Sequence, residues 1–262
     1  MERRLPAKKP PNNTGHRLLQ GLGWIYLTIF LLAVWIVLSR SYPQLIPTPT
    51  ATIEALESYG TARILHAVRI TLANSLIGYA IALGLAVLSV LLSYASRHLE
   101  AFFNALNTLV QSISVLVWAI VLVMIFGVTS RKPPILVVTA ATYPVLLSSL
   151  FGAVRSIDSR IMLLARSLGA GKWEELFYFV LPGTIPYLAA ASRTAIGIAL
   201  RISVVAEAFG SSGGVGYWLV FSYDYGYKEG VFAWALVLVV LMIAVDMLLL
   251  RPVERWSEKW KL

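Results

Sequence analysis

The chain has 262 residues, of which 58% are hydrophobic and only 13% are charged. A soluble domain carries about a quarter charged residues, so much of this surface faces something less polar than water. The absence of cysteine excludes disulfides, thiolate nucleophiles and cysteine metal sites. The net charge is +9, but the basic residues cluster at the ends of apolar runs. This placement indicates membrane topology and contact with anionic lipid, and we expect no nucleic-acid binding.

Six apolar runs are long enough to cross a bilayer, whose hydrocarbon core needs about 20 residues of helix. In chain order they are Gly23–Ser39, a run within Val68–Tyr94, Thr108–Phe126, Ile135–Val154, Ile185–Ala208 and Val231–Leu250. A proline- and asparagine-containing basic tail at residues 1–22 is predicted to be disordered. Between the first two runs, Thr50–His66 is polar enough to form a helix lying along the membrane. The sequence therefore predicts an all-α polytopic membrane bundle of six transmembrane helices, with one membrane domain at residues 23–262.

The basic residues are distributed unequally between the two sides of this bundle. Six crossings place both termini on one side, where the tails and connecting loops hold fourteen Lys and Arg residues against six on the other side. Because positively charged loops stay in the cytoplasm, we expect both termini and the loop at residues 155–182 to be cytoplasmic. The localisation expected is the inner membrane of the cell.

The loop at residues 155–182 has helical signals of its own. Asp158 or Ser159 is a plausible N-cap, followed by an apolar stripe with the spacing of one helix face. Gly169 then ends this helix as a C′ glycine. A second short helix, Lys172–Val180, is predicted to stop before Pro182. This unit is too short and polar to span the bilayer, so we expect it to lie along the membrane and present one side to a partner.

The spacing within this loop resembles that of importer permeases with the type I fold. Their motif reads EAA, three residues, G, nine residues, I, one residue, LP. Here Leu163–Ala165 is followed at the same spacing by Gly169, Phe179 and Leu181–Pro182, although the Glu, the first Ala and the Ile are absent. The run Ala165–Trp173 also resembles the nitrate/sulfonate/taurine branch of ABC importers. Further matches are Trp118, Phe126–Gly127, Val205–Glu207, Gly214–Tyr217, Asp246 and Trp260.

The resemblance implies a non-catalytic permease subunit that moves a small solute, such as a sulfonate, taurine or nitrate, into the cytoplasm by alternating access. It implies a homodimer, two cytoplasmic ATPase subunits that bind ATP and Mg²⁺, and an extracytoplasmic substrate-binding protein; the chain itself would bind no cofactor. Related branches carry pyrimidine vitamin precursors or aromatic compounds, which stay alternatives. The residues expected to form the ATPase-coupling loop are Arg160, Ala165, Arg166, Gly169, Ala170, Trp173, Leu181 and Pro182.

Two charged residues, Arg201 and Glu207, fall inside the fifth apolar run. A lone charge at mid-bilayer costs at least about 2.5–3.5 kcal/mol, so each should face a cavity or a partner. Six residues separate them by about 120° around a helix, so a direct pair is not expected. We assign both, with Trp118, to the translocation path. For Arg201 a structural role, bonded to carbonyls of neighbouring helices, is an equal alternative.

Other function classes have weaker support. A secondary transporter could use Glu207 and Asp246 to carry ions, and an intramembrane enzyme would need a catalytic constellation that the sequence does not suggest. The glycine-rich Gly210–Gly216 lacks the Gly-Lys-Ser/Thr ending of a phosphate loop and is better explained as a turn or gate element. The three histidines are dispersed, so no metal site is predicted.

Overall fold

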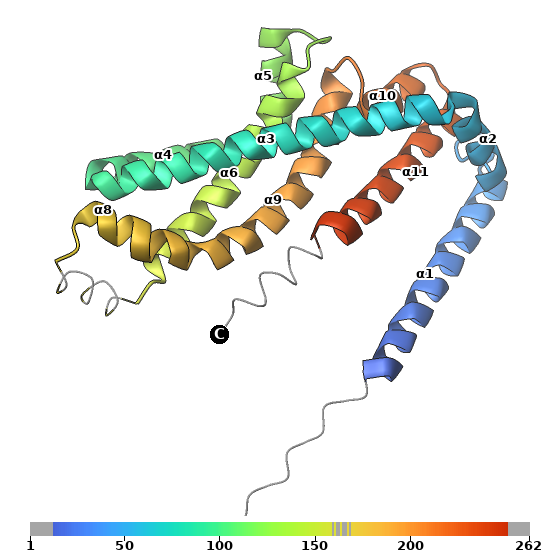
Figure 1. The fold of residues 1–262 in the computed structure, drawn as a ribbon. Coiled ribbons are helices and arrows are strands. Elements are labelled where there is room, and N and C mark those ends of the chain that lie inside the picture. Colours follow the sequence, from blue (N-terminus) through green and yellow to red (C-terminus); the bar gives the residue numbers. More distant parts are fainter. Residues whose placement is uncertain (1–12, 159, 161–162, 164–166, 168, 251–262) are drawn as a thin grey trace, which may run out of the picture. The chain divides into compact units, whose positions relative to one another are not determined.

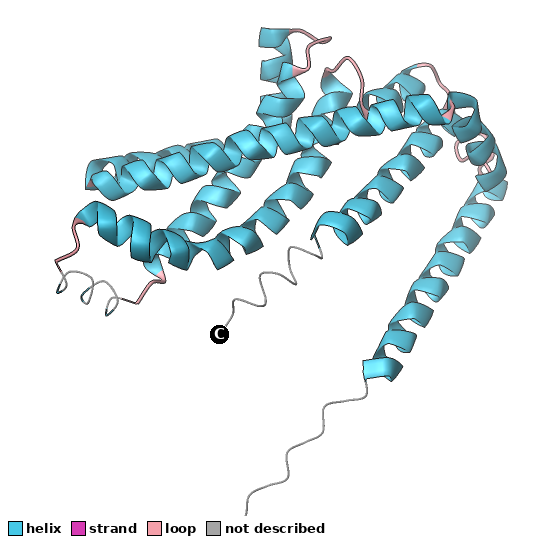
Figure 2. Cartoon of the chain, in the orientation of Figure 1, coloured by secondary structure: helices cyan, strands magenta, loops and turns pink. Residues whose placement is uncertain are grey.

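The computed structural model describes residues 13–250 except 159, 161–162, 164–166 and 168. Within these residues the chain is helical with turns and contains no strand, which confirms the predicted all-α class (Figure 2). The chain divides into two compact units, residues 1–54 and 55–262.

The first unit holds α1 (Asn13–Ser41) and the beginning of α2 (Pro49–Tyr59). The indole nitrogen of Trp35 donates to the carbonyl of Pro47 at 3.0 Å and so fixes the chain after α1. The first predicted run lies within α1. Helix α1 begins at Asn13, so the second half of the tail predicted to be disordered is helical, and the rest of that tail lies outside the described residues.

The second unit contains the remaining helices (Figure 1). They are α3 (Thr61–Ala95), α4 (Arg97–Ser112), α5 (Val115–Phe126), α6 (Lys132–Arg155), α8 (Lys172–Glu175), the π-helix η1 (Leu176–Val180), α9 (Leu181–Phe209), α10 (Val215–Asp224), α11 (Lys228–Val245) and the π-helix η2 (Asp246–Leu250). The polar helix predicted at Thr50–His66 ends at Tyr59, because Gly60 adopts φ +74° and α3 begins directly after it.

Helices α3, α6 and α9 pack against one another and form the centre of this unit. The face that α3 buries is made mostly of small residues: Ala67, Thr71, Ser75, Gly78, Ala82, Ala86, Ser89 and Ser93. Small residues let helix backbones approach closely, which is how helices associate where lipid removes the hydrophobic driving force. The larger side chains of Leu146 and Leu147 on α6 fill the space opposite and are fully buried.

Four helices in the described part of the chain are long and apolar enough to cross a membrane, or five if one bent pair counts as a single span. They are α3, α6, the helix from Lys172 to Phe209, and the helix from Lys228 to Leu248; the bent pair is α4 with α5. Ile25–Ser41 is a shorter apolar helix. The chain is thus a multi-pass membrane protein, but the predicted count of six spans is not confirmed.

The third predicted run, Thr108–Phe126, is not one continuous helix. It breaks at Ile113 and Ser114, and α4 and α5 meet at 91°. The Ser114 hydroxyl accepts the backbone N–H of Leu116 at 3.4 Å, so a serine offers the backbone an alternative to continuing the helix. In Figure 1, α4 lies alongside α3, whereas α5 points away from both helices.

The predicted stop before Pro182 is wrong as well. Helix α8, η1 and α9 run on as one helical stretch from Lys172 to Phe209. Proline lacks a backbone N–H and so removes one hydrogen bond from an α-helix. Here the helix continues through a π-turn, in which Leu181 N–H bonds to the carbonyl of Leu176, five residues back. The last turns of the predicted loop therefore form the start of a membrane helix.

Candidate functional site

The loop between α6 and α8 begins with two local turns. The backbone N–H of Ser156 bonds to the carbonyl of Gly152 at 3.0 Å and ends α6. The Asp158 carboxylate then accepts the backbone N–H of Arg160 at 2.8 Å, as the predicted N-cap would. Arg160 is helical and exposed. Ala165 and Arg166, both assigned to the coupling loop, lie outside the described residues.

Gly169 adopts φ +82°, the left-handed conformation that ends helices, which confirms the predicted C′ glycine. A Cβ at this position would meet nothing within 4 Å, so the backbone conformation, and not lack of space, favours glycine. Gly171 N–H then donates to the Glu174 carboxylate at 2.8 Å and starts α8. Ala170 thus lies in the short non-helical turn that precedes α8.

Exposed aromatic side chains follow this turn on α8 and η1. Trp173, Phe177 and Tyr178 are 52%, 55% and 74% exposed, and the rings of Trp173 and Phe177 stack at 6.4 Å. Pro182 is also exposed, and Leu181 is half-buried. Contiguous exposed apolar side chains mark membrane or protein contacts.

Polar contacts anchor the base of the loop to the bundle. The Lys172 ammonium donates to the carbonyl of Ala95, the last residue of α3, at 3.0 Å. The Arg155 guanidinium pairs with Glu100 of α4 at 3.2 Å. A cavity of about 260 Å³ lies between these contacts. Both ends of the loop are thus tied to the bundle through α3 and α4.

Glu207 is buried inside the second unit, with 1% of its surface exposed. Its carboxylate accepts hydrogen bonds from the Thr71 hydroxyl (2.8 Å), Asn74 Nδ2 (2.9 Å), the Ser203 hydroxyl (3.1 Å) and Gly216 N–H (3.2 Å). These donors lie on α3, α9 and α10. Glu207 therefore forms a junction between three helices, and its place on a translocation path stays a prediction.

The glycine-rich turn at residues 210–216 folds back onto this carboxylate. Gly214 adopts φ +108°, and a Cβ there would collide with Glu207. A Cβ on Gly216 would collide with the carbonyl of Val204. Val215 N–H donates to the Thr71 hydroxyl at 2.9 Å. Glycine is needed at these positions because the backbone of the turn lies directly against α9. The sequence alone does not reveal this reason for the glycine-rich run.

Arg201 lies on another face of α9. Its side chain is exposed, and among the described residues it has no hydrogen bond or ion pair. The predicted separation of Arg201 from Glu207 is confirmed, since one residue is exposed and the other buried. The alternative that neighbouring carbonyls hold Arg201 finds no such bond among the described residues.

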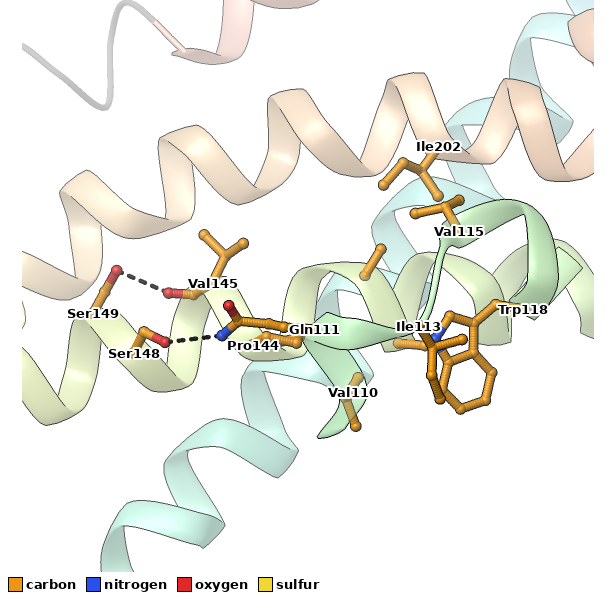
Figure 3. A pocket seen from close by; sticks show the side chains of 12 residues that line it. Val110, Gln111, Ile113, Val115, Trp118, Pro144, Val145, Ser148, Ser149 and Ile202 are labelled. Carbon is orange, nitrogen blue, oxygen red and sulfur yellow. Dashed lines mark hydrogen bonds between the residues drawn. The ribbon is translucent and has the colours of Figure 1, made fainter. Parts of the chain in front are cut away.

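Trp118 lines two cavities in the second unit. The larger, of about 450 Å³, lies at the break between α4 and α5 and also borders α6 and α9 (Figure 3). The other, of about 330 Å³, is almost wholly apolar. The sequence analysis assigned Trp118 to a translocation path, which stays a prediction, and it missed Gln111 and Ser148, which line the larger cavity. Their signal was available, because both are polar residues inside apolar runs.

Within the described residues, no group of three or more His, Cys, Asp or Glu side chains could hold a metal ion. This holds for the surroundings of Glu207 and for the cavity at Trp118.

Relatives agree with this architecture. The putative aliphatic sulfonates transport permease protein SsuC of Bacillus subtilis is 24% identical over 259 residues, which cover 97% of this chain and 92% of that protein. The nitrate import permease protein NrtB of Synechococcus elongatus is 25% identical and covers 77% of this chain and 76% of its own length. Further relatives are named for transport of taurine, bicarbonate and formylaminopyrimidine.

Solved structures share the fold. The permease of the MetNI methionine ABC transporter in inward-facing conformations superposes with a TM-score of 0.63 at 17% identity, over 75% of this chain and 95% of that chain. A chain of an amino acid ABC transporter with bound histidines gives a TM-score of 0.63 at 14% identity. The family described as binding-protein-dependent transport system inner membrane component matches residues 78–257. With more than half of the chain matched, and with the fold of importer permeases, this protein belongs to that family of inner-membrane transport components.

Proposed function

We propose that the chain is the permease subunit of an ATP-driven importer that carries a small anion into the cytoplasm. The observation that carries the coupling to ATP is the loop at residues 155–182, with the left-handed Gly169 and exposed apolar side chains beside it. Support for an anionic cargo comes from relatives named for sulfonates, nitrate, taurine and bicarbonate. One relative is named for formylaminopyrimidine, so a pyrimidine cargo is the alternative.

In this proposal the coupling loop docks on a cytoplasmic ATPase subunit, which holds the ATP and Mg²⁺. Arg160, Trp173 and the turn at Gly169 and Ala170 meet the ATPase, together with Ala165 and Arg166. The anchors of Lys172 to α3 and Arg155 to α4 support transmission of the ATPase motion to the bundle. Both chain termini lie on the same cytoplasmic side, as the charge asymmetry predicts.

A second copy of the chain completes the pathway in this proposal. Arg201 is an exposed charge, with no partner in the described part of the chain, within a helix long enough to span the membrane. Lipid contact would cost at least about 2.5–3.5 kcal/mol. A water-filled path between two copies removes that cost. The two copies alternate between inward- and outward-facing states, and an extracytoplasmic binding protein delivers the cargo.

Replacing Gly169 by arginine is the test of the coupling assignment. We expect the variant to be inserted in the membrane but to lose the ATPase subunit on co-purification, because arginine strains the φ +82° turn and enlarges the docking surface. The measurement is ATP hydrolysis by the complex purified through a tag on this chain.

A matched control is Gly226→Arg. Gly226 also has a positive φ (+67°) and open space around its Cβ position, but it lies beyond the opposite end of α9. It should retain the ATPase. If Gly169→Arg keeps the complex and its hydrolysis, the coupling assignment is wrong. Uptake that an ionophore abolishes, and that loss of the ATPase leaves unchanged, would favour the ion-coupled transporter with Glu207 and Asp246.

Arg201→Ala tests the path in vesicles that contain the whole transporter. We expect the KM for ethanesulfonate uptake to rise by about tenfold, since a cation next to the path is worth on the order of 1.4 kcal/mol of attraction for an anion. Arg201→Lys keeps the charge and should recover most of the affinity. Wild-type rate and affinity in Arg201→Ala would remove this residue from the path.

A further inference from the structure

The cavity at the α4–α5 break has a shape and position suited to a small solute. Its volume is about 450 Å³, within the range of small-molecule sites. It is lined by Val110 and Gln111 of α4, Val115 and Trp118 of α5, residues of α6 and Ile202 of α9. A discontinuous membrane helix is the usual way to bring unpaired backbone and polar groups to the middle of a transporter.

One hydroxyl in this cavity has a proton to donate. Ser148 Oγ accepts Asn107 Nδ2 at 2.9 Å and Gln111 Nε2 at 3.4 Å, and Figure 3 shows the second of these bonds. Two amide donors occupy the acceptor positions of the hydroxyl. No acceptor for the Ser148 proton occurs among the hydrogen bonds of the described residues. The neighbouring Ser149 hydroxyl is already used, because it donates to the carbonyl of Val145.

A second donor is the indole N–H of Trp118, which lines the same cavity. Its Nε1 atom is buried, and it has no hydrogen-bond partner among the residues that the structure describes. The indole N–H can only donate, and a buried donor without a partner is costly. An oxygen acceptor that reaches the Trp118 N–H would relieve that cost. Ser148 is exposed, so its hydroxyl pays no burial cost, but it can donate its proton to the same acceptor.

The electrostatic surroundings agree with an acceptor of negative charge. None of the described residues that line the cavity is an Asp or a Glu. Helix α5 begins at Val115, a lining residue, so the positive end of a helix of 12 residues faces the cavity. Ile202, which lines the cavity beside Val115, directly follows Arg201 in the sequence, although Arg201 itself does not line the cavity.

We infer that this cavity holds the oxyanion head group of the cargo, such as a sulfonate, through the Ser148 hydroxyl, the Gln111 amide and the Trp118 indole. The inference rests on the proposed function, and it deepens it by naming the residues that select the head group. Neutral donors bind an anion without an opposing full charge, so the anion is held weakly enough to leave, as passage through a membrane requires.

The test measures binding without transport. The full chain is purified in detergent, and its thermal midpoint is compared in sodium ethanesulfonate and in sodium chloride of equal ionic strength. A ligand that binds only the folded state raises the midpoint, and we expect a rise of at least about 2 °C in the wild type. The rise should disappear in Gln111→Glu, which places a negative charge in the cavity, and shrink at least twofold in Ser148→Ala.

Asn104→Asp is the matched control for Gln111→Glu. It makes the same amide-to-carboxylate change on α4, two turns earlier, at a residue that does not line the cavity. It should keep the full rise. The midpoints in chloride report whether each variant is folded. The absence of a rise in the wild type, or an equal rise in all variants, would overturn the inference.

Uptake in vesicles separates this inference from the proposed function. If the complex lacks ATP-dependent uptake while ethanesulfonate still stabilises only the chains with Gln111, the proposed function fails and the anion site stands. If the wild type takes up ethanesulfonate and Gln111→Glu does so with the same KM, the cavity is not the head-group site. We expect the KM of Gln111→Glu for ethanesulfonate uptake to rise at least tenfold.

Discussion

Glu207→Ala is expected to lower the free energy of unfolding by about 3–5 kcal/mol, because it removes the acceptor shared by four buried donors. Those donors lie on three helices: Thr71 and Asn74 on α3, Ser203 on α9 and Gly216 on α10. Each lost bond costs the desolvation of its donor, and no water from the bulk replaces the acceptor at a site that is 1% exposed. Unfolding of the purified chain by a denaturing detergent measures the loss.

Glu207→Gln separates shape from bonding at the same position. Glutamine keeps the volume and one acceptor oxygen, but its amide nitrogen faces a donor, so we expect a smaller loss of about 1–3 kcal/mol. Glu57→Ala is the control, because Glu57 is an exposed glutamate at the end of α2. If Glu207→Ala is as stable as Glu57→Ala, the junction does not hold the three helices together.

Gly78→Ala is expected to separate α3 from α6 and to cost about 1–3 kcal/mol, the usual penalty for overpacking a dense interior. A Cβ at Gly78 would lie 2.7 Å from the carbonyl oxygen of Ile135 and 2.7 Å from Val138 Cβ. The carbonyl cannot move without moving α6, and the Gly78 carbonyl also accepts the Thr139 hydroxyl at 3.1 Å. The thermal midpoint of the purified chain reports the change.

The same substitution six residues later should act in the opposite direction. Gly84 lies on the same helix, and a Cβ there would meet nothing within 4 Å. Alanine in a helix interior is favoured over glycine by about 0.5–1 kcal/mol, so Gly84→Ala should be neutral or stabilising. Equal effects at the two glycines would show that α3 and α6 do not pack as closely as the structure has them.

The turn at Gly169 could be predicted from the sequence because it depends on local chemistry. An apolar stripe, a glycine and a following polar segment define a helix end within a few residues, and the structure has that glycine at φ +82°. The all-α class follows from the length and apolar content of the runs in the same local way. The family resemblance also came from this loop, through spacing that a single sequence displays.

The breaks and continuities of helices were predicted less well. The run Thr108–Phe126 is apolar enough to be predicted as one span. It nevertheless contains two helices, and Ser114 caps the start of the second. At Pro182 local rules predict the end of a helix, but the helix continues through a π-turn. In both cases the outcome depends on a few backbone bonds that hydropathy does not measure.

The sequence by itself determined that this chain is helical, lies in a membrane and has the coupling-loop spacing of an importer permease. Only the tertiary structure showed which donors surround Glu207 and which cavity Trp118 lines. Thr71 and Glu207 are 136 residues apart and meet at 2.8 Å, and Gln111 meets Ser148 across 37 residues. Apolar length and turn chemistry are properties of neighbouring residues, whereas the partner of a buried polar group is set by how distant helices pack.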